Sequence, residues 1–314
     1  MTSAAGDRPE VGTVPAGPER LSVSDWIQVF KRAAKEFMAD GCMDLAKQIA
    51  FSSTLAFFPA IAFLLGVLGL FNLFDDVKTF LDPIAPAGVV KFVTGLQKDS
   101  QSDTGATIAL IVGFLGASWA ASGAMGTVVN AVNRAYERIE SRPFWKVRLI
   151  SIVLVILSGL VTAAMFLLIV FGGPLGNAIA KKAHAGGAFD LLWAIFRWPI
   201  AFVAVLLFFS LIYYLAPDLP HRNWKWVTPG ALVGALLFLA LSGLFAVYAT
   251  LSGSYTKTYG SLAAGIILLL WLNYTAWAIL FGAELNSELD RQADIRAAGG
   301  ERAGLIKPAR RTAT

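Results

Sequence analysis

One stretch of the sequence constrains the fold more than any other. Between Gly260 and Phe281 the residues are predominantly apolar, with one strong interruption at Asn273, and formal charge returns only at Glu284. A helix of about 20 apolar residues spans the ~30 Å hydrocarbon core of a bilayer. The stretch 254–286 therefore predicts a membrane-spanning helix, around or beside which the rest of the chain packs.

Five other stretches have a similar length and apolar character. They cover approximately residues 49–74, 105–129, 148–171, 191–215 and 227–251. Only 15% of all residues are charged, whereas soluble domains average roughly 25%. We therefore expect an all-α integral membrane protein with six transmembrane helices.

The basic residues predict how these helices are oriented. With six spans, both termini lie on one side of the membrane, and 19 of the 26 lysines and arginines fall on that side. Six fall on the other side, and Arg197 lies within a span. Because basic loops stay in the cytoplasm, both termini are expected there. The same rule explains the net charge of +5 without a nucleic-acid partner.

The segments outside the spans have distinct compositions. Residues 1–23 are rich in Pro, Gly, Ala and Ser, and residues 291–314 are rich in Ala, Gly and Arg, so both predict disordered cytoplasmic tails. The long outer loop 75–104 mixes apolar and charged residues. This composition predicts amphipathic helices on the outer membrane surface, broken at Pro83 and Pro86.

A further amphipathic helix is predicted over residues 24–40. Its apolar side chains recur at helical spacing, at Trp26, Val29, Phe30, Ala33 and Phe37. The opposite face carries Lys31, Arg32 and Lys35. Such a helix either lies in the membrane interface with its basic side toward anionic headgroups, or packs on the cytoplasmic loops of the protein itself.

The sequence lacks the common catalytic and metal-binding motifs. Its single cysteine is Cys42, and its two histidines, His184 and His221, fall on opposite sides of the predicted membrane. There is no H-x-H, H-E-x-x-H or C-x-x-C spacing, no phosphate-binding G-x-x-x-x-G-K-[ST] loop, and no G-x-S-x-G elbow with plausible partners. We therefore expect a protein that is not an enzyme and that uses no metal or cofactor.

Polar residues within the spans are the better functional candidates. Arg197 lies seven residues beyond Asp190, so it sits roughly 10 Å below the outer surface. Its guanidinium either snorkels to the headgroups or binds a phosphate or another anion. The neighbouring Pro199 weakens the helix beside it. Tyr255 and Tyr259 fall at a similar depth, and they belong either to an aromatic belt or to the same anion site.

Three residues fall near the middle of the membrane, namely Trp119, Asn273 and Pro59. Asn273 either hydrogen-bonds a neighbouring helix or contacts a ligand, Trp119 is a candidate for the same ligand, and Pro59 can kink the first span. Glu284 reaches the inner end of the last span. A group of basic residues is predicted at the same level: Arg134, Arg138, Arg142, Lys146 and Arg148. We therefore expect an ion pair between Glu284 and an arginine.

Small residues mark surfaces where helices can approach closely. The segment 116–126 is nearly continuous in Gly, Ala and Ser, and Gly230 and Gly234 stand four residues apart in the fifth span. In lipid, such surfaces let helix backbones pack against one another. The alternative for the segment 116–126 is that it lines a cavity.

Many of these residues form a pattern that resembles one protein family. The strongest part of the pattern comprises Tyr214, Pro217, Trp224, Pro229, Gly230, Gly234, Phe245, Tyr248, Ser254, Tyr255, Tyr259, Gly260, Ser261, Leu262, Leu270, Trp271 and 282–286. From about Asp44 to Asp290 the chain resembles the YihY/virulence factor BrkB family of six-span bacterial inner-membrane proteins. The segment 50–59 looks like the first helix of that family, except that Ala56 stands where a serine is common.

The resemblance implies a multi-pass protein of the bacterial inner membrane. Members have carried the name ribonuclease BN, which is regarded as a misassignment, and others are linked to export of lipopolysaccharide precursors or to solute transport. We expect a non-enzymatic transporter of a lipid or another anionic amphipath, with anionic lipids and a periplasmic or membrane protein as partners. The alternatives are a secondary transporter or channel for a small ion or osmolyte, and a structural or partner-binding membrane component.

Overall fold

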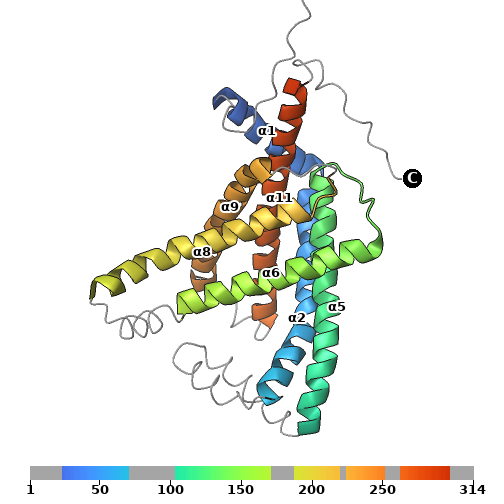
Figure 1. Ribbon diagram of the computed structural model, residues 1–314, viewed down its shortest axis with the longest axis vertical. Coiled ribbons are helices and arrows are strands. Elements are labelled where there is room, and N and C mark those ends of the chain that lie inside the picture. The colour runs from blue at the N-terminus through green and yellow to red at the C-terminus, as the bar shows by residue number, and fades with distance from the viewer. Residues whose placement is uncertain (1–22, 71–102, 171–186, 220–223, 252–261, 298–314) are drawn as a thin grey trace, which may run out of the picture.

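The described part of the chain folds into long α-helices (Figure 1). The computed structural model describes residues 23–70, 103–170, 187–219, 224–251 and 262–297. Its helices are α1 (Val23–Ala39), α2 (Cys42–Leu70), α5 (Asp103–Ala135), α6 (Phe144–Val170), α8 (Gly187–Leu215), α9 (Trp224–Leu251) and α11 (Leu262–Ala297). The described residues are thus almost entirely helical, as the sequence predicts, whereas the proposed helices of the loop 75–104 lie almost wholly outside them.

Five of the described helices are long and apolar enough to cross a membrane, namely α5, α6, α8, α9 and α11. They fall on the second to sixth predicted spans. The first predicted span, 49–74, falls largely on α2, which is also a single long helix. The protein is therefore a membrane protein with several spanning helices, and the total of six spans stays a prediction.

Buried apolar side chains gather toward one end of the helices. Among the described side chains they lie between Cys42 and Ala50 in α2, between Ala124 and Ala135 in α5, and between Ala276 and Leu289 in α11. The helix α1 lies at this same end (Figure 1), which we call the α1 end. Among the described side chains, burial is therefore concentrated at the α1 end.

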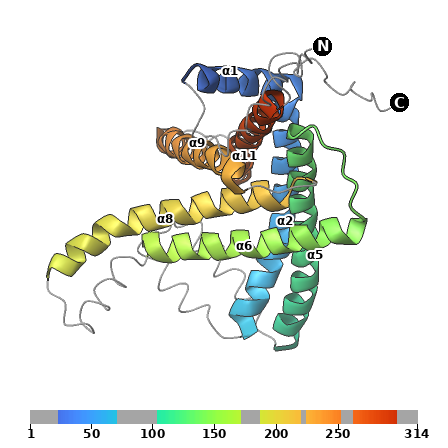
Figure 2. The same ribbon diagram turned by 45° about the horizontal axis from the view of Figure 1, so that its top comes forward.

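The helices α6 and α8 depart from an upright bundle. Both views show them side by side and running crosswise to α2 and α5 (Figures 1 and 2). Large apolar side chains on both helices are exposed, including Leu149, Ile152, Ile156 and Leu160 of α6 and Ile195, Phe196, Trp198 and Val203 of α8. An exposed apolar surface of this extent is stable only when lipid or another apolar partner covers it.

The helix α1 uses its predicted apolar face to contact the protein. Val29 and Ala33 are fully buried in a cluster with Leu285 and Leu289 of α11, and Phe37 packs near Phe281. This apolar face therefore packs on a membrane-spanning helix. The sequence instead suggested a location in the membrane interface or on the cytoplasmic loops. The location of α1 in the membrane interface stays a prediction.

The last helix is longer than the sequence predicts. It continues to Ala297, past the start of the tail predicted at residue 291. The buried contact of Leu285 and Leu289 with α1 continues the packing toward the C-terminal end of this helix. An ion pair of 3.0 Å between Arg291 and Glu288, three residues apart, supports the added turn.

The close crossing of α9 and α11 depends on two glycines. A Cβ atom on Gly282 would overlap the hydroxyl of Tyr213 and the carbonyl oxygen of Gly230. The hydroxyl of Tyr213 donates a hydrogen bond of 2.8 Å to the carbonyl oxygen of Ile279, and the amide of Gly230 donates one of 2.8 Å to Oδ1 of Asn286. The predicted role of Gly230 in close helix packing is confirmed.

Candidate functional site

The candidate site is built on a guanidinium that lies over a tryptophan where α6 crosses α5. The guanidinium carbon of Arg148 is 4.1 Å from the centroid of the Trp119 ring. Nη2 of Arg148 also donates a hydrogen bond of 2.9 Å to the carbonyl oxygen of Trp119. The Trp119 residue itself is 69% exposed. A cation is therefore held in place next to an aromatic ring that other molecules can reach.

The position of this pair along α5 differs from the sequence-based expectation for Arg148. Trp119 lies sixteen residues, or about 24 Å, before the end of α5 at Ala135. It also lies within the apolar stretch 111–135 that is long enough to cross a membrane. We predicted Arg148 at the cytoplasmic rim with Glu284, but the crosswise course of α6 brings it to the middle of α5 instead.

The surroundings of the pair combine apolar surface with hydroxyl groups. Leu115 is exposed one helical turn from Trp119, and Leu149 is exposed next to Arg148 in the sequence. Ser122 is buried, and its hydroxyl donates to the carbonyl oxygens of Ser118 and Trp119 at 2.6 and 3.0 Å. The site thus presents one cation and one exposed aromatic ring within an apolar surface.

Arg197 forms a second, weaker site of the same kind on α8. Its guanidinium carbon lies 5.6 Å from the ring centroid of the adjacent Trp198, and its Nε is buried without a hydrogen-bond partner among the described residues. Pro199, inside the same helix, is exposed. Tyr255 and Tyr259, the predicted partners of Arg197, lie outside the described residues.

The two arginines lie at separate positions along the paired helices α6 and α8. The start of α6 is fixed next to the end of α8, because Nη1 of Arg142 donates a hydrogen bond of 3.2 Å to the carbonyl oxygen of Leu215. Arg148 lies one helical turn into α6, and Arg197 lies eighteen residues before Leu215. At 1.5 Å per residue, the two guanidinium groups are separated by about 20 Å along the pair.

Asn273 and Pro59 occupy positions within α11 and α2. Oδ1 of Asn273 is buried without a hydrogen-bond partner among the described residues, and the same holds for Nε1 of Trp277, one turn further along α11. Pro59 lies inside α2 against α5, where a Cβ atom on Gly116 would lie 3.3 Å from its ring. The segment 116–126 therefore packs against α2 at Gly116, as one of its two predicted roles requires.

The expected ion pair of Glu284 with an arginine is absent from the described residues. Glu284 is only 2% exposed and accepts a hydrogen bond of 3.3 Å from the thiol of Cys42, whereas Arg134 is exposed. The prediction was wrong because it placed Glu284 and the arginines at the same depth, whereas the sequence does not show which helix faces Glu284. The start of α2, which carries Cys42, fills that position.

Three carboxylates also gather at the α1 end, although the sequence showed no cluster of acidic metal ligands. Oxygen atoms of Glu36, Asp40 and Glu137 lie within 4.8 Å of one another. The sequence could not reveal this group, because Glu137 lies about a hundred positions from the other two and meets them only in the folded chain. Glu36 and Asp40 are half-buried and Glu137 is exposed. Exposed acidic groups of this kind are common in proteins, and this one carries no functional assignment.

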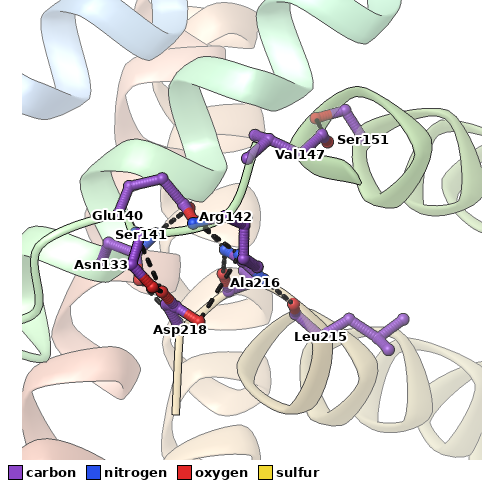
Figure 3. A network of polar contacts seen from close by, with 9 residues as sticks. All are labelled: Asn133, Glu140, Ser141, Arg142, Val147, Ser151, Leu215, Ala216 and Asp218. Carbon is purple, nitrogen blue, oxygen red and sulfur yellow. Dashed lines mark hydrogen bonds and ion pairs between the residues drawn. The ribbon is translucent and has the colours of Figure 1, made fainter. Parts of the chain in front are cut away.

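A polar network ties the connection between α5 and α6 to the end of α8, and we call it the loop clasp (Figure 3). Arg142, whose side chain is 5% exposed, lies at its centre. Its two terminal nitrogens donate to the carbonyl oxygens of Leu215 and Ala216 at 3.2 and 2.6 Å. It thereby caps the C-terminus of α8, where carbonyl groups lack helical partners and a cation is favoured.

Four further side chains complete the loop clasp. Glu140 accepts hydrogen bonds from Nε and Nη2 of Arg142, both at 2.6 Å. Asn133 donates to Glu140 at 2.8 Å and accepts from the backbone amide of Asp218 at 2.7 Å. Asp218 accepts from the amide and the hydroxyl of Ser141. This network holds α6 and α8 together at one end, and so fixes where Arg148 and Arg197 stand.

Acidification is expected to weaken the loop clasp. The side-chain hydrogen bond from Ser141 lowers the pKa of Asp218 below its ordinary value, and the hydrogen bonds from Arg142 lower the pKa of Glu140. A carboxyl whose pKa is lower in the folded state stabilises the fold above its unfolded pKa, and this stabilisation is lost as pH falls through the folded pKa. The melting temperature in detergent should therefore fall as pH decreases from about 5.

The variant Glu140→Gln/Asp218→Asn provides the control for this pH dependence. Neither amide titrates, so the melting temperature of the variant should start lower at neutral pH and decline less steeply on acidification. An equally steep decline in the variant would show that other carboxyls carry the effect.

The comparison with protein families identifies the chain. A family model described as virulence factor BrkB matches residues 33–305. The chain belongs to this family. The resemblance that the sequence pattern indicated is thus confirmed, and the match includes every described helix from α2 onward.

This BrkB-family protein is similar to curated proteins from several bacteria. It is 30% identical over 246 residues to the "Putative ribonuclease-like protein YfkH" of Bacillus subtilis, with 78% of this chain and 89% of that protein covered. It is 26% identical over 267 residues to a "UPF0761 membrane protein" of Stenotrophomonas maltophilia, with 81% of this chain covered. The alignment spans only 58% of the length of that second relative. No solved structure matches the chain.

Proposed function

We propose that this BrkB-family protein moves a lipid or another anionic amphipath across or out of the bacterial inner membrane, without catalysing a reaction. The observation that supports this proposal is the guanidinium of Arg148 over the exposed ring of Trp119, in the middle of an apolar helix. A molecule with an anionic head and apolar chains fits such a surface, because the head meets the guanidinium and the chains meet apolar side chains.

The energetics favour an anion as the partner of Arg148. A guanidinium within the hydrocarbon costs about 2.5–3.5 kcal/mol on insertion scales unless it is paired or snorkels. One carbonyl oxygen and one aromatic ring satisfy only part of its five N–H donors. A phosphate or carboxylate can accept two parallel hydrogen bonds from the remaining fork. The exposed side chains of α5 and α6 would then pack against the acyl chains.

The second arginine suggests a route rather than a single binding site. Arg197 lies about 20 Å from Arg148 along the α6–α8 pair, and the side chains of both helices between them are largely apolar. In this proposal the anionic head passes from one guanidinium to the other while its chains stay in lipid. Trp119 and Trp198, beside the two arginines, are exposed. This exposure favours the mechanism over a channel for a small ion, which needs an enclosed polar path.

The test is transfer of a fluorescent anionic phospholipid between the leaflets of proteoliposomes. Arg148→Ala should reduce the transfer rate by about tenfold, because a charge-assisted hydrogen bond is worth ~1.5–3 kcal/mol. Arg148→Lys keeps the charge but loses the fork, so it should be impaired less. Arg197→Ala should also slow transfer.

Arg138→Ala is the matched control for these variants, since Arg138 is exposed and lies outside the spans. Its transfer rate should equal that of the unmodified protein. Full activity in both Arg148→Ala and Arg197→Ala, with unchanged melting curves, would contradict the proposed route. Loss of activity together with loss of folding would instead make the arginines structural.

A further inference from the structure

The helix α1 carries a second apolar stripe that the described residues of the protein leave exposed. The first stripe, with Val29, Ala33 and Phe37, is buried against the protein. The second stripe consists of Val23, Ile27, Phe30, Ala34 and Met38, which recur at intervals of three and four residues. The side chains of Ile27, Phe30 and Met38 are 50%, 39% and 62% exposed.

Exposed cations flank this second stripe. Lys31 and Lys35 follow its apolar residues by one position, so they lie at its edge, and both are exposed. The polar residues Asp25, Arg32 and Glu36 lie further around the helix, on the side opposite the stripe. The helix therefore has three surfaces, one packed on the protein, one apolar with a basic edge, and one polar.

The location of α1 limits what can cover this stripe. It packs beside Leu285 and Leu289 of α11, at the edge of the apolar stretch 265–291 that is long enough to cross a membrane. In both views α1 lies crosswise to α11 (Figures 1 and 2). Met43 and Phe51, in the first part of α2, are also exposed.

We propose that the stripe formed by Ile27, Phe30, Ala34 and Met38 docks on the anionic lipid surface next to the spans, with Lys31 and Lys35 at the level of the headgroups. An amphipathic helix binds such a surface through buried apolar area together with attraction between basic side chains and anionic lipids. Each lysine near an anionic surface adds to this attraction. A second copy of the chain or a soluble protein would not require the basic edge.

The experiment measures which residues of α1 contact acyl chains in the full-length protein. A fluorescent probe is attached to Ile27→Cys, Met38→Cys and, as a matched control, Gln28→Cys, whose side chain is exposed and lies about 100° around the helix from Ile27. The parent chain reports the background from Cys42, which is buried. Each variant is placed in nanodiscs that contain phosphatidylglycerol and a phosphatidylcholine with a nitroxide on its acyl chain.

Docking predicts that the nitroxide lipid quenches the probes at positions 27 and 38 about threefold more strongly than the probe at position 28. Aqueous iodide should quench them in the reverse order. Adding Lys31→Glu and Lys35→Glu should reduce the lipid quenching at position 38 to its level in discs of phosphatidylcholine alone. The variant must retain the melting temperature of the parent, because α1 also packs on α11.

Two results would overturn the proposal. Equal quenching at all three positions, with full access to iodide, would show that the stripe faces water. Protection of positions 27 and 38 from both quenchers, together with crosslinking between copies, would assign the stripe to an interface of the protein with itself.

Discussion

The substitution Gly282→Val should leave the protein without its detergent-stable fold. A Cβ atom on Gly282 would overlap the hydroxyl of Tyr213 and the backbone carbonyl of Gly230. Neither group can move easily. The hydroxyl of Tyr213 donates a hydrogen bond to the carbonyl of Ile279, and the carbonyl of Gly230 belongs to the packed helix α9. Overpacking a core costs about 1–3 kcal/mol for small additions, and the two extra methyl groups of valine should exceed that range.

The control for this prediction is Gly265→Val on the same helix. Among the described residues, nothing lies within 4 Å of a Cβ atom at Gly265, so the same change in residue type and propensity meets no described neighbour. Size-exclusion profiles and melting curves of the two variants should differ sharply. Equal stability of Gly265→Val and Gly282→Val would contradict the close crossing of α9 and α11.

The substitution Arg142→Ala should cost about 3 kcal/mol of stability. Its side chain is 5% exposed, and its removal leaves Glu140 and two carbonyl groups at the end of α8 without their main donor. Because the loop clasp holds the start of α6 at the end of α8, the variant should also lose lipid transfer. Unfolding in detergent with increasing denaturant measures the first effect.

Two variants show whether the geometry of Arg142 matters as well as its charge. Arg142→Lys cannot reach the carboxylate of Glu140 and both carbonyl groups at once, so it should recover only part of the stability. Arg138→Ala, in the same connection, removes an exposed arginine and should leave stability unchanged. A loss in Arg138→Ala equal to that in Arg142→Ala would mean that the total charge of the loop, rather than the clasp, stabilises the fold.

The sequence was sufficient to predict the helices but not how they cross. The apolar runs fall on helices because a run of about 20 apolar residues has the length and composition of a helix that crosses a bilayer. The helices α6 and α8 are apolar around their whole circumference, so their sequences contain no stripe that indicates a packing face. Their crosswise course therefore could not be predicted.

The same limit explains the outcome at the candidate site. Trp119 was predicted as a binding residue from its depth, and Arg148 was placed at the rim because upright helices were assumed. The contact between them joins residues 29 positions apart through a crossing that only the fold defines. The loop clasp was missed for the same reason, since Ser141 and Asp218 lie 77 positions apart. The depth of a residue in its own helix is readable from sequence, whereas its neighbour on another helix is not.

The most direct test of the proposed anion site is a density map of the protein in nanodiscs that contain phosphatidylglycerol. The proposal predicts density for a phosphate group within hydrogen-bonding distance of the Arg148 guanidinium. It also predicts acyl chains along Trp119 and the exposed face of α6. A well-ordered Arg148 that contacts only Trp119 and water, with no lipid beside it, would contradict the proposal.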